Sequence, residues 1–271
     1  MTDSATTVRA PGSAFTERTV DAAGFTVRYL EAGNGPALLC LPGAGGPVMT
    51  FALDTLAEHF RVIVIELPGW GSQPNEVDDF DGLAAQVAEI ATALGLDRFH
   101  LMGTSFGGAC ALHFVTRHAD RVESLVLEAP AKFRESSTNP SQLAPEAFLK
   151  AFRSHPERVP QMGPPDPAFM ARVWPTVERL MGDGSDDGLA ARLADVPTRT
   201  LILFGRDDGI INPINGRTLR RAMRNSSLQY VYDAAHDIQS DRPEAFADVV
   251  GDFLERGMKF LINDQDGLIN P

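Results

Sequence analysis

The chain has 271 residues, of which 44% are apolar and 22% charged, and this composition fits one large globular domain and excludes disorder for most of its length. The formal net charge of −12 repels phosphate backbones and anionic lipid, so neither nucleic acid nor a membrane surface is expected as a partner. The two cysteines, Cys40 and Cys110, stand in apolar or small-residue segments and are expected to be buried thiols rather than a disulfide.

The N-terminal residues 1–14 are small and polar, and we expect them to be flexible. They lack the basic and apolar regions of a signal peptide. No apolar run of the chain approaches the length that spans a bilayer. These features together favour a cytoplasmic protein.

Strand-like and helix-like patterns alternate from residue 15 to residue 130. Short apolar or alternating runs predict strands at 15–20, 25–31, 37–41, 62–66, 99–102 and 122–127. Apolar residues at helical spacing predict helices around 51–60, over 80–94 and through 110–114. This alternation is typical of βαβ units, so the predicted fold class is α/β, with a mostly parallel, doubly wound sheet.

The alternation stops at residue 131 and resumes near residue 200. Residues 131–196 contain proline-rich linkers and three predicted helices, at 147–152, 169–181 and 189–193. Further strands are expected at 200–204 and 228–232, and a last helix at 243–254. We therefore expect a core of residues 15–130 and 197–256, with 131–196 inserted as a helical cap over a pocket. The tail, 257–271, has no predicted role, although its apolar residues Phe260, Leu261 and Ile262 are candidates for packing.

A serine stands in a glycine-flanked turn between a predicted strand and a predicted helix. The segment is Gly103-Thr104-Ser105-Phe106-Gly107. A serine in so tight a turn needs small residues two positions away on either side, and the turn raises its hydroxyl above the end of the sheet. The N–H of Phe106 would then lie at a helix N-terminus, facing the same space. The alternative interpretation is a glycine-rich turn without a catalytic role.

Other polar motifs follow the ends of neighbouring predicted strands. The loop of residues 42–46, Pro-Gly-Ala-Gly-Gly, comes directly after a buried strand, where glycines let backbone N–H groups face a ligand oxygen. Asp207 and Asp208 follow the first strand after the insertion, and His236 follows the next. The order Ser, Asp, His at successive strand ends is expected of a nucleophile, an orienting acid and a base that meet at one edge of a sheet.

With these motifs, residues 15–256 resemble the α/β-hydrolase family. The resemblance rests on the turn at Ser105 and on the segments 42–46, 67–72, 205–208 and 236–246. The chain departs from the family pattern at Pro42, where the family usually has histidine, and at Ala235, where glycine usually precedes the base.

The resemblance implies a role for each matching residue. Ser105 is the expected nucleophile, His236 the expected base and then acid, and Asp208 the carboxylate that orients the imidazole. Asp207 competes for that last role, but the family spacing after the strand favours Asp208. Family members that are dehalogenases or epoxide hydrolases carry aspartate in the turn, so Ser105 argues against both reactions.

The resemblance also implies that the N–H groups of Ala44 and Phe106 form an oxyanion hole and that Trp70 borders the pocket. Most aromatic residues of the insertion are expected to pack in the cap, while some face the pocket, because the cap offers little else to an apolar substrate. The expected substrate contacts are Gly43, Trp70, Phe148 and Trp174.

No cofactor or metal is expected. No cysteine–histidine cluster has zinc spacing, and no glycine-rich phosphate loop is followed by lysine. Residues 183–188 imitate the start of a calcium loop, but the position that needs glutamate is Ala194. His113 and His118 are expected to be packed or solvated.

The expected activity is hydrolysis of a small carboxylic ester or lactone through an acyl-enzyme, with a small molecule as the partner and a homodimer as one allowed assembly. Two alternatives stay open. Similar capped members hydrolyse a carbon–carbon bond in a ring-cleavage product, a vinylogous diketone, with the same triad. A hydrolase-like receptor or lyase would instead use the pocket to bind a ligand.

Overall fold

The computed structural model describes residues 10–71, 73–133, 143–158, 166–182 and 188–260. The start of the predicted flexible N-terminus (1–9), most of the calcium-like segment (183–187) and the end of the tail with Leu261 and Ile262 lie outside the described residues.

The strands of the described chain form one sheet in the order β1-β2-β4-β3-β5-β6-β7-β8. Their bounds are β1 (Thr16–Ala22), β2 (Phe25–Ala32), β3 (Ala37–Leu41), β4 (Arg61–Ile65), β5 (Phe99–Thr104), β6 (Val122–Glu128), β7 (Arg199–Gly205) and β8 (Ser226–Val231). β1 pairs antiparallel with β2, and β2 with β4, whereas all pairs from β4 to β8 are parallel. The predicted mostly parallel α/β sheet is thus confirmed.

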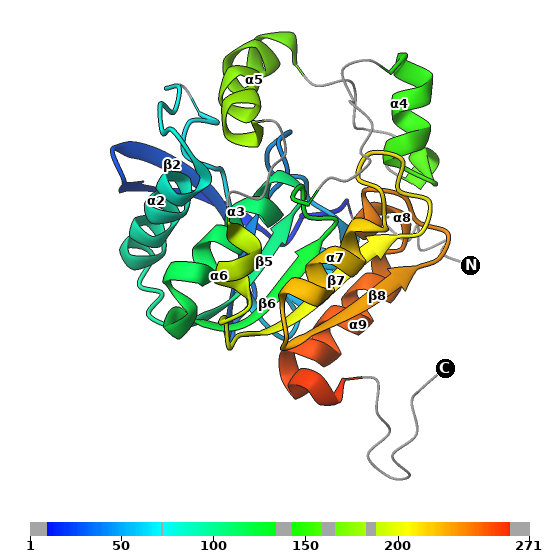
Figure 1. Cartoon of the computed structure of the whole chain (residues 1–271). Helices are drawn as coiled ribbons and strands as arrows, with labels where there is room; N and C mark the ends of the chain where they lie inside the picture. Colours follow the sequence, from blue (N-terminus) through cyan, green and yellow to red (C-terminus); the bar gives the residue numbers. More distant parts are fainter. Residues whose placement is uncertain (1–9, 72, 134–142, 159–165, 183–187, 261–271) are drawn as a thin grey trace, which may run out of the picture.

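Helices cover both faces of the sheet (Figure 1). Their bounds are α1 (Phe51–Leu56), α2 (Phe80–Ala93), α3 (Phe106–Arg117), α4 (Pro145–Phe152), α5 (Pro167–Met181), α6 (Leu189–Leu193), α7 (Asn215–Ala222), α8 (Ile238–Asp241) and α9 (Pro243–Arg256). α1 and α9 pack together on one face, and α2 and α3 pack on the other. Because β3 to β7 are covered on both faces, nearly every residue in them is buried, which is why each contains a short run of apolar residues.

Two helices that the sequence pattern did not predict follow β7 and β8. α7 has the sequence Asn-Gly-Arg-Thr-Leu-Arg-Arg-Ala, with too few apolar residues to show an amphipathic period. α8 has four residues, about one helical turn, so the period cannot repeat within it. The predicted helix around 51–60 also ends earlier, at Leu56.

Of the helices between β6 and β7, α4 and α5 stand beyond the ends of the strands, at the top of Figure 1, whereas α6 packs against α3 and α7. α5 and α6 both contribute buried apolar residues to the main core, Val173, Val177 and Leu180 from α5 and Leu189 and Leu193 from α6, whereas no residue of α4 is buried. The division of the chain into core and cap stays a prediction.

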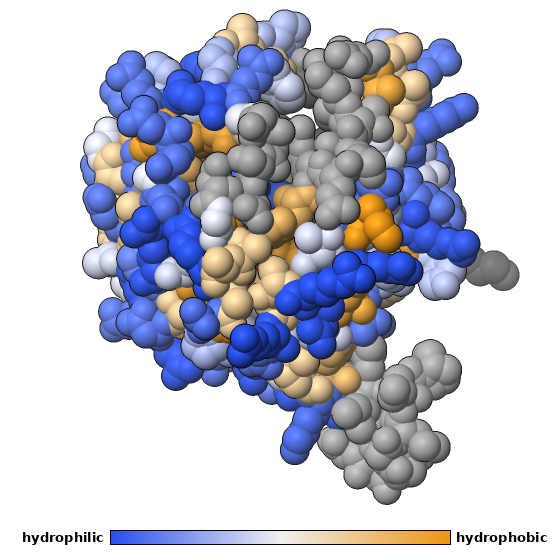
Figure 2. Space-filling view, in the orientation of Figure 1, coloured by the Kyte–Doolittle hydropathy of each residue, from blue (hydrophilic) through white to orange (hydrophobic). Residues whose placement is uncertain are grey.

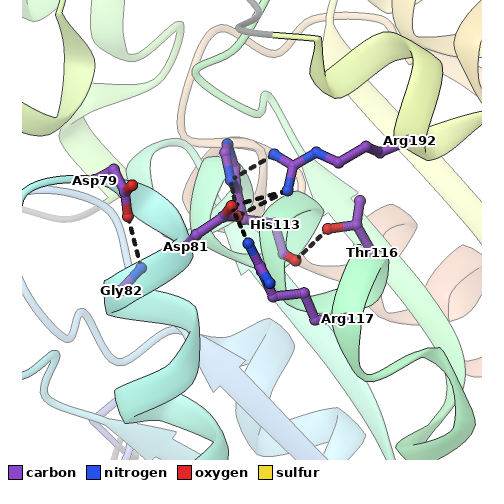
Figure 3. A network of polar contacts seen from close by, with 7 residues as sticks. All are labelled: Asp79, Asp81, Gly82, His113, Thr116, Arg117 and Arg192. Carbon is purple, nitrogen blue, oxygen red and sulfur yellow. Dashed lines mark hydrogen bonds and ion pairs between the residues drawn. The ribbon is translucent and has the colours of Figure 1, made fainter.

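A polar network also joins α6 to α2 and α3 (Figure 3). Asp81 of α2 accepts hydrogen bonds from Arg117 and Arg192 and contacts Nδ1 of His113 at 2.7 Å. Burial favours the neutral acid, but the hydrogen bonds from Arg117, His113 and Arg192 outweigh it and hold the pKa of Asp81 well below its usual range. His113 is therefore packed within a charged cluster.

Beyond α9 the chain continues against the core. Phe260 is buried, and its ring lies 5.4 Å from the ring of Phe253. The outer surface in view is mainly hydrophilic, with smaller apolar patches (Figure 2). None of the helices in the described ranges is both long and apolar enough to cross a membrane.

Candidate active site

Ser105 lies between β5 and α3 in a backbone conformation that residues other than glycine seldom adopt. Its φ is 50° and its ψ is −112°. Strain of this kind costs roughly 1–3 kcal/mol and persists only where the surroundings hold it. Here the N–H of Ser105 donates to the carbonyl oxygen of Glu128 at 2.9 Å, and the carbonyl of Ser105 accepts from Ala131 at 2.9 Å. Backbone bonds to β6 and to the residues after it thus hold the turn.

The glycines on either side of this turn are required by close contacts. A Cβ atom on Gly103 would lie 2.6 Å from the carbonyl oxygen of Gly107. A Cβ atom on Gly107 would overlap the carbonyl oxygen of Leu41, at the end of β3. The turn therefore packs against its own helix and against β3 at distances that only glycine allows.

His236 contacts Asp208 and not Asp207. Its Nδ1 lies 2.8 Å from Oδ2 of Asp208, and both residues are buried. The second oxygen of this carboxylate, Oδ1, accepts hydrogen bonds from the N–H groups of Ile210 at 2.8 Å and Ile211 at 2.9 Å. Asp207 is exposed. The structure thus brings together the residues predicted as base and orienting acid, from the loops after β8 and β7.

Neighbouring carboxylates favour the protonated form of His236. Burial lowers the pKa of the imidazole, but the charges of Asp208, Glu128 and Asp237 outweigh burial and raise the pKa above 6.5. With Nδ1 facing a carboxylate, Nε2 is the ring nitrogen left to exchange a proton with another group. Asp208 therefore holds the imidazole in one orientation, with Nε2 available for proton transfer.

The glycine loop after β3 runs beside Ser105. A Cβ atom on Gly43 would lie 3.6 Å from the Cβ of Ser105. The carbonyl oxygen of Ala44 accepts a hydrogen bond from Nε1 of Trp70 at 2.8 Å. Pro42, the departure from the family pattern, has no N–H, so it supplies no donor. The loop and the first residue of α3 flank Ser105, which is where the predicted donors of Ala44 and Phe106 lie.

Phe106 and Trp70 are packed behind this loop. Their rings lie 5.3 Å apart, and each residue is only 1% exposed. As the first residue of α3, Phe106 has an N–H with no acceptor inside the helix. The structure assigns Trp70 a supporting contact to Ala44, while its predicted contact with substrate stays a prediction.

Of the two predicted contacts from the insertion, only Phe148 is linked to His236 by the ring contacts of the described residues. Its ring stacks on Phe152 at 5.5 Å, and the ring of Phe152 lies 5.3 Å from that of His236. Trp174, on α5, donates its indole N–H to Glu178 on the same helix at 2.8 Å. The roles of both predicted residues are still predictions.

A buried carboxyl group that the sequence pattern did not reveal lies behind Ser105. Glu128, the last residue of β6, is fully buried, and burial raises its pKa to about 7. It accepts hydrogen bonds from the hydroxyl of Thr104 at 2.8 Å and from the backbone N–H of Gln239 at 3.1 Å. Glu128 thus ties the residue before Ser105 to the helix that follows His236.

The described residues contain no group of three or more His, Cys, Asp or Glu side chains placed to hold a metal ion.

Comparison with known proteins gives a family and several relatives. Residues 38–249 match the model of the alpha/beta hydrolase family. A 2-hydroxy-6-oxo-6-phenylhexa-2,4-dienoate hydrolase of Burkholderia cepacia is 28% identical, over 86% of this chain and 92% of its own length. A pimeloyl-[acyl-carrier protein] methyl ester esterase of Neisseria meningitidis is 29% identical, over 80% of this chain and 91% of its own. The crystal structure of a serine hydrolase from Cycloclasticus zankles has a TM-score of 0.73 at 20% identity, covering 89% of this chain and 98% of that one.

Proposed function

The chain belongs to the alpha/beta hydrolase family, and we propose that it is a serine hydrolase that cleaves a small carboxylic ester or lactone through an acyl-enzyme. The observation that carries the proposal is the buried contact of His236 with Asp208, at the same edge of the sheet as the strained turn of Ser105. The likeness to a methyl ester esterase and to a dienoate hydrolase supports hydrolysis as the reaction type.

In the proposed reaction, the hydroxyl of Ser105 gives its proton to Nε2 of His236 while its oxygen bonds to the carbonyl carbon of the substrate. The carbonyl oxygen becomes an oxyanion, which the N–H groups of Ala44 and Phe106 stabilise. The C–O bond to the alcohol then breaks, and the alkoxide leaves with the proton from His236. Water adds to the acyl-enzyme by the same steps, with His236 again as base, and releases the acid and the free serine. Asp208 stabilises the imidazolium through Nδ1 in each half of the cycle.

The insertion takes part in the proposal as a cap that forms part of the substrate pocket. α4 reaches His236 through the ring of Phe152. α5 approaches the glycine loop, because a Cβ on Gly46 would lie 3.6 Å from the ring of Phe169. These contacts support a cap that bounds the space above Ser105.

The proposal is tested with p-nitrophenyl acetate and butyrate, by following release of p-nitrophenolate. Wild-type protein should show a burst equal to the enzyme concentration if deacylation is slow, and steady turnover in either case. Ser105→Ala and His236→Ala should each lose on the order of 10³-fold or more, and the double variant should be little worse, because the residues of a triad act together. A single variant that keeps more than a tenth of wild-type activity would overturn the assignment. No turnover and no burst by wild type would favour a ligand-binding receptor.

Hydrolysis of a carbon–carbon bond is the second candidate, because the compound in the name of the Burkholderia cepacia relative, a 2-hydroxy-6-oxo dienoate, is a vinylogous diketone with no ester bond to cleave. The same preparations are therefore given 2-hydroxy-6-oxo-6-phenylhexa-2,4-dienoate, and loss of its conjugated absorbance is followed. Turnover of this compound without turnover of the esters would replace the ester proposal with this one.

A further inference from the structure

The end of α4 is joined by backbone hydrogen bonds to both loops that carry the proposed base and its acid. The carbonyl oxygen of Ala151 accepts from the N–H of Gly209 at 3.0 Å, and that of Phe152 accepts from the N–H of Asp237 at 3.0 Å. Gly209 and Asp237 are the residues directly after Asp208 and after the base. We refer to residues 151–155 as the α4 clasp. One segment of the insertion thus spans both loops.

A buried ion pair strengthens the clasp at the loop of the base. Arg153 donates from Nε at 2.7 Å and from Nη2 at 2.6 Å to Oδ2 of Asp237. The side chains of Arg153 and Asp237 are only 4% and 12% exposed. Loss of one member of a buried pair leaves the other charge without its partner, which has a far larger effect than loss of a surface pair.

The carboxylate of Asp241 binds backbone N–H groups of the α4 clasp. It is fully buried, and its carboxylate accepts from the N–H groups of Ser154 at 2.9 Å and His155 at 2.8 Å. It also accepts from the N–H of Ala235 at 2.8 Å, which is the residue before the base. The chain on both sides of His236 is therefore tied to the same five residues of the insertion.

Three carboxylates act on His236. Asp208 lies on the loop after β7, Glu128 on β6 and Asp237 on the loop of the imidazole itself, and Arg153 of the α4 clasp is paired with Asp237. The negative charge of Asp237 is one of those that raise the pKa of His236. Arg153 lies against that carboxylate, so it opposes the effect.

We propose that Arg153 is a positioning residue for the hydrolysis: through Asp237 it holds the loop of His236 in place and neutralises the carboxylate next to the imidazole. This inference rests on the proposed function. It assigns the insertion a part in setting the state of the base, in addition to forming a pocket wall. The competing interpretation is that the ion pair contributes only to folding.

The two interpretations differ in the pH dependence that they predict. A general base must be neutral to accept a proton, so kcat/KM falls as the pH drops through the pKa of His236. Arg153→Gln leaves Asp237 unopposed, and the midpoint of that fall should rise by at least about 0.5 pH unit, which by itself lowers kcat/KM at pH 7 by up to about 3-fold. Asp237→Asn leaves the cation unopposed, and the midpoint should fall. The double variant should return close to the wild-type midpoint, and Arg153→Lys should keep that midpoint with a lower kcat.

The control is Lys150→Gln, which removes the same charge from an exposed position of α4 and should change neither the midpoint nor kcat/KM by more than about 2-fold. The midpoint is measured twice, from p-nitrophenyl butyrate hydrolysis and from an NMR titration of the His236 ring, assigned by its absence in His236→Ala. The NMR arm needs no turnover, so it tests the coupling even if the protein cleaves no ester. Should Arg153→Gln not fold, the opposite shift in Asp237→Asn still decides the question. Lower melting temperatures with an unchanged midpoint in both single variants would show that the pair serves folding alone and would overturn the proposal.

Discussion

Replacement of Asp208 by asparagine changes one atom, and the structure determines how the new amide must orient. Oδ1 of Asp208 receives N–H bonds from Ile210 and Ile211 at 2.8 and 2.9 Å, while Oδ2 faces Nδ1 of His236. If the amide oxygen takes the place of Oδ1, the side chain keeps both N–H bonds and turns its NH₂ toward the imidazole. The opposite orientation loses both bonds and sets NH₂ against two donors, which costs about 2–4 kcal/mol.

The favoured orientation gives the wrong tautomer. An NH₂ group that faces Nδ1 requires that nitrogen to be an acceptor, so the ring proton moves to Nε2, which then has no lone pair for the serine proton. About 3 kcal/mol leaves less than roughly 1% of molecules with the amide reversed and the tautomer correct. The expected loss in kcat/KM for Asp208→Asn is therefore between about 100-fold and 10⁴-fold.

The assay compares Asp208→Asn with Asp207→Asn in the hydrolysis of p-nitrophenyl butyrate at pH 7 to 8. Asp207 is exposed, so its variant should stay within about 2-fold of wild type. Thermal melting confirms that both variants are folded. If Asp208→Asn keeps more than a tenth of the activity, or if Asp207→Asn is the more damaged, the tautomer argument is wrong.

Three other predictions follow from the structure. Phe148→Ala should change the ratio of kcat/KM for a long against a short ester by roughly 10-fold, as should Trp174→Ala, if these residues line the pocket; lower melting temperatures with an unchanged ratio would mark them as packing residues. Asp81→Asn should lower the free energy of unfolding at pH 7 by about 2 kcal/mol. Because the folded pKa of Asp81 lies below 3.8, its stabilisation is present above that pH and is lost as the pH falls through the folded value, so urea unfolding should show a difference that shrinks below pH 3.8; a constant difference would contradict this. Gly107→Ala should lose at least about 2 kcal/mol, whereas Gly45→Ala, whose Cβ meets nothing within 4 Å, should change by less than about 0.5 kcal/mol; equal urea midpoints would refute the close contact with β3.

The sheet was predictable because strands that are buried on both faces consist largely of consecutive apolar residues. Each residue of β3 is apolar, and the predicted bounds match the structure. The turn at Ser105 was predictable for a different reason, since close approach leaves glycine as the only choice at Gly103 and Gly107. The polar residues near the site follow because parallel strands end at one edge.

What could not be predicted depends on contacts between distant residues. Arg153 and Asp237 are 84 residues apart, and neither stands in a pattern that distinguishes it from a solvated charge. Glu128 ends an apolar strand, and its partner Gln239 comes 111 residues later. α7 has its one fully buried leucine, Leu219, among arginines, so tertiary packing rather than periodicity determines it.

The position of the insertion determines how far its length and sequence can vary without loss of stability. β6 and β7 are hydrogen-bonded neighbours, yet about 70 residues separate them along the chain. The entropy of closing so long a loop depends only weakly on its length, and halving it would alter the cost by about 0.6 kcal/mol. A longer, shorter or different segment at this place, in evolution or in the laboratory, should therefore change the stability of the sheet only slightly. The constraint lies instead at the α4 clasp, where any replacement segment must again supply acceptors for Gly209 and Asp237 and a partner for the buried carboxylate.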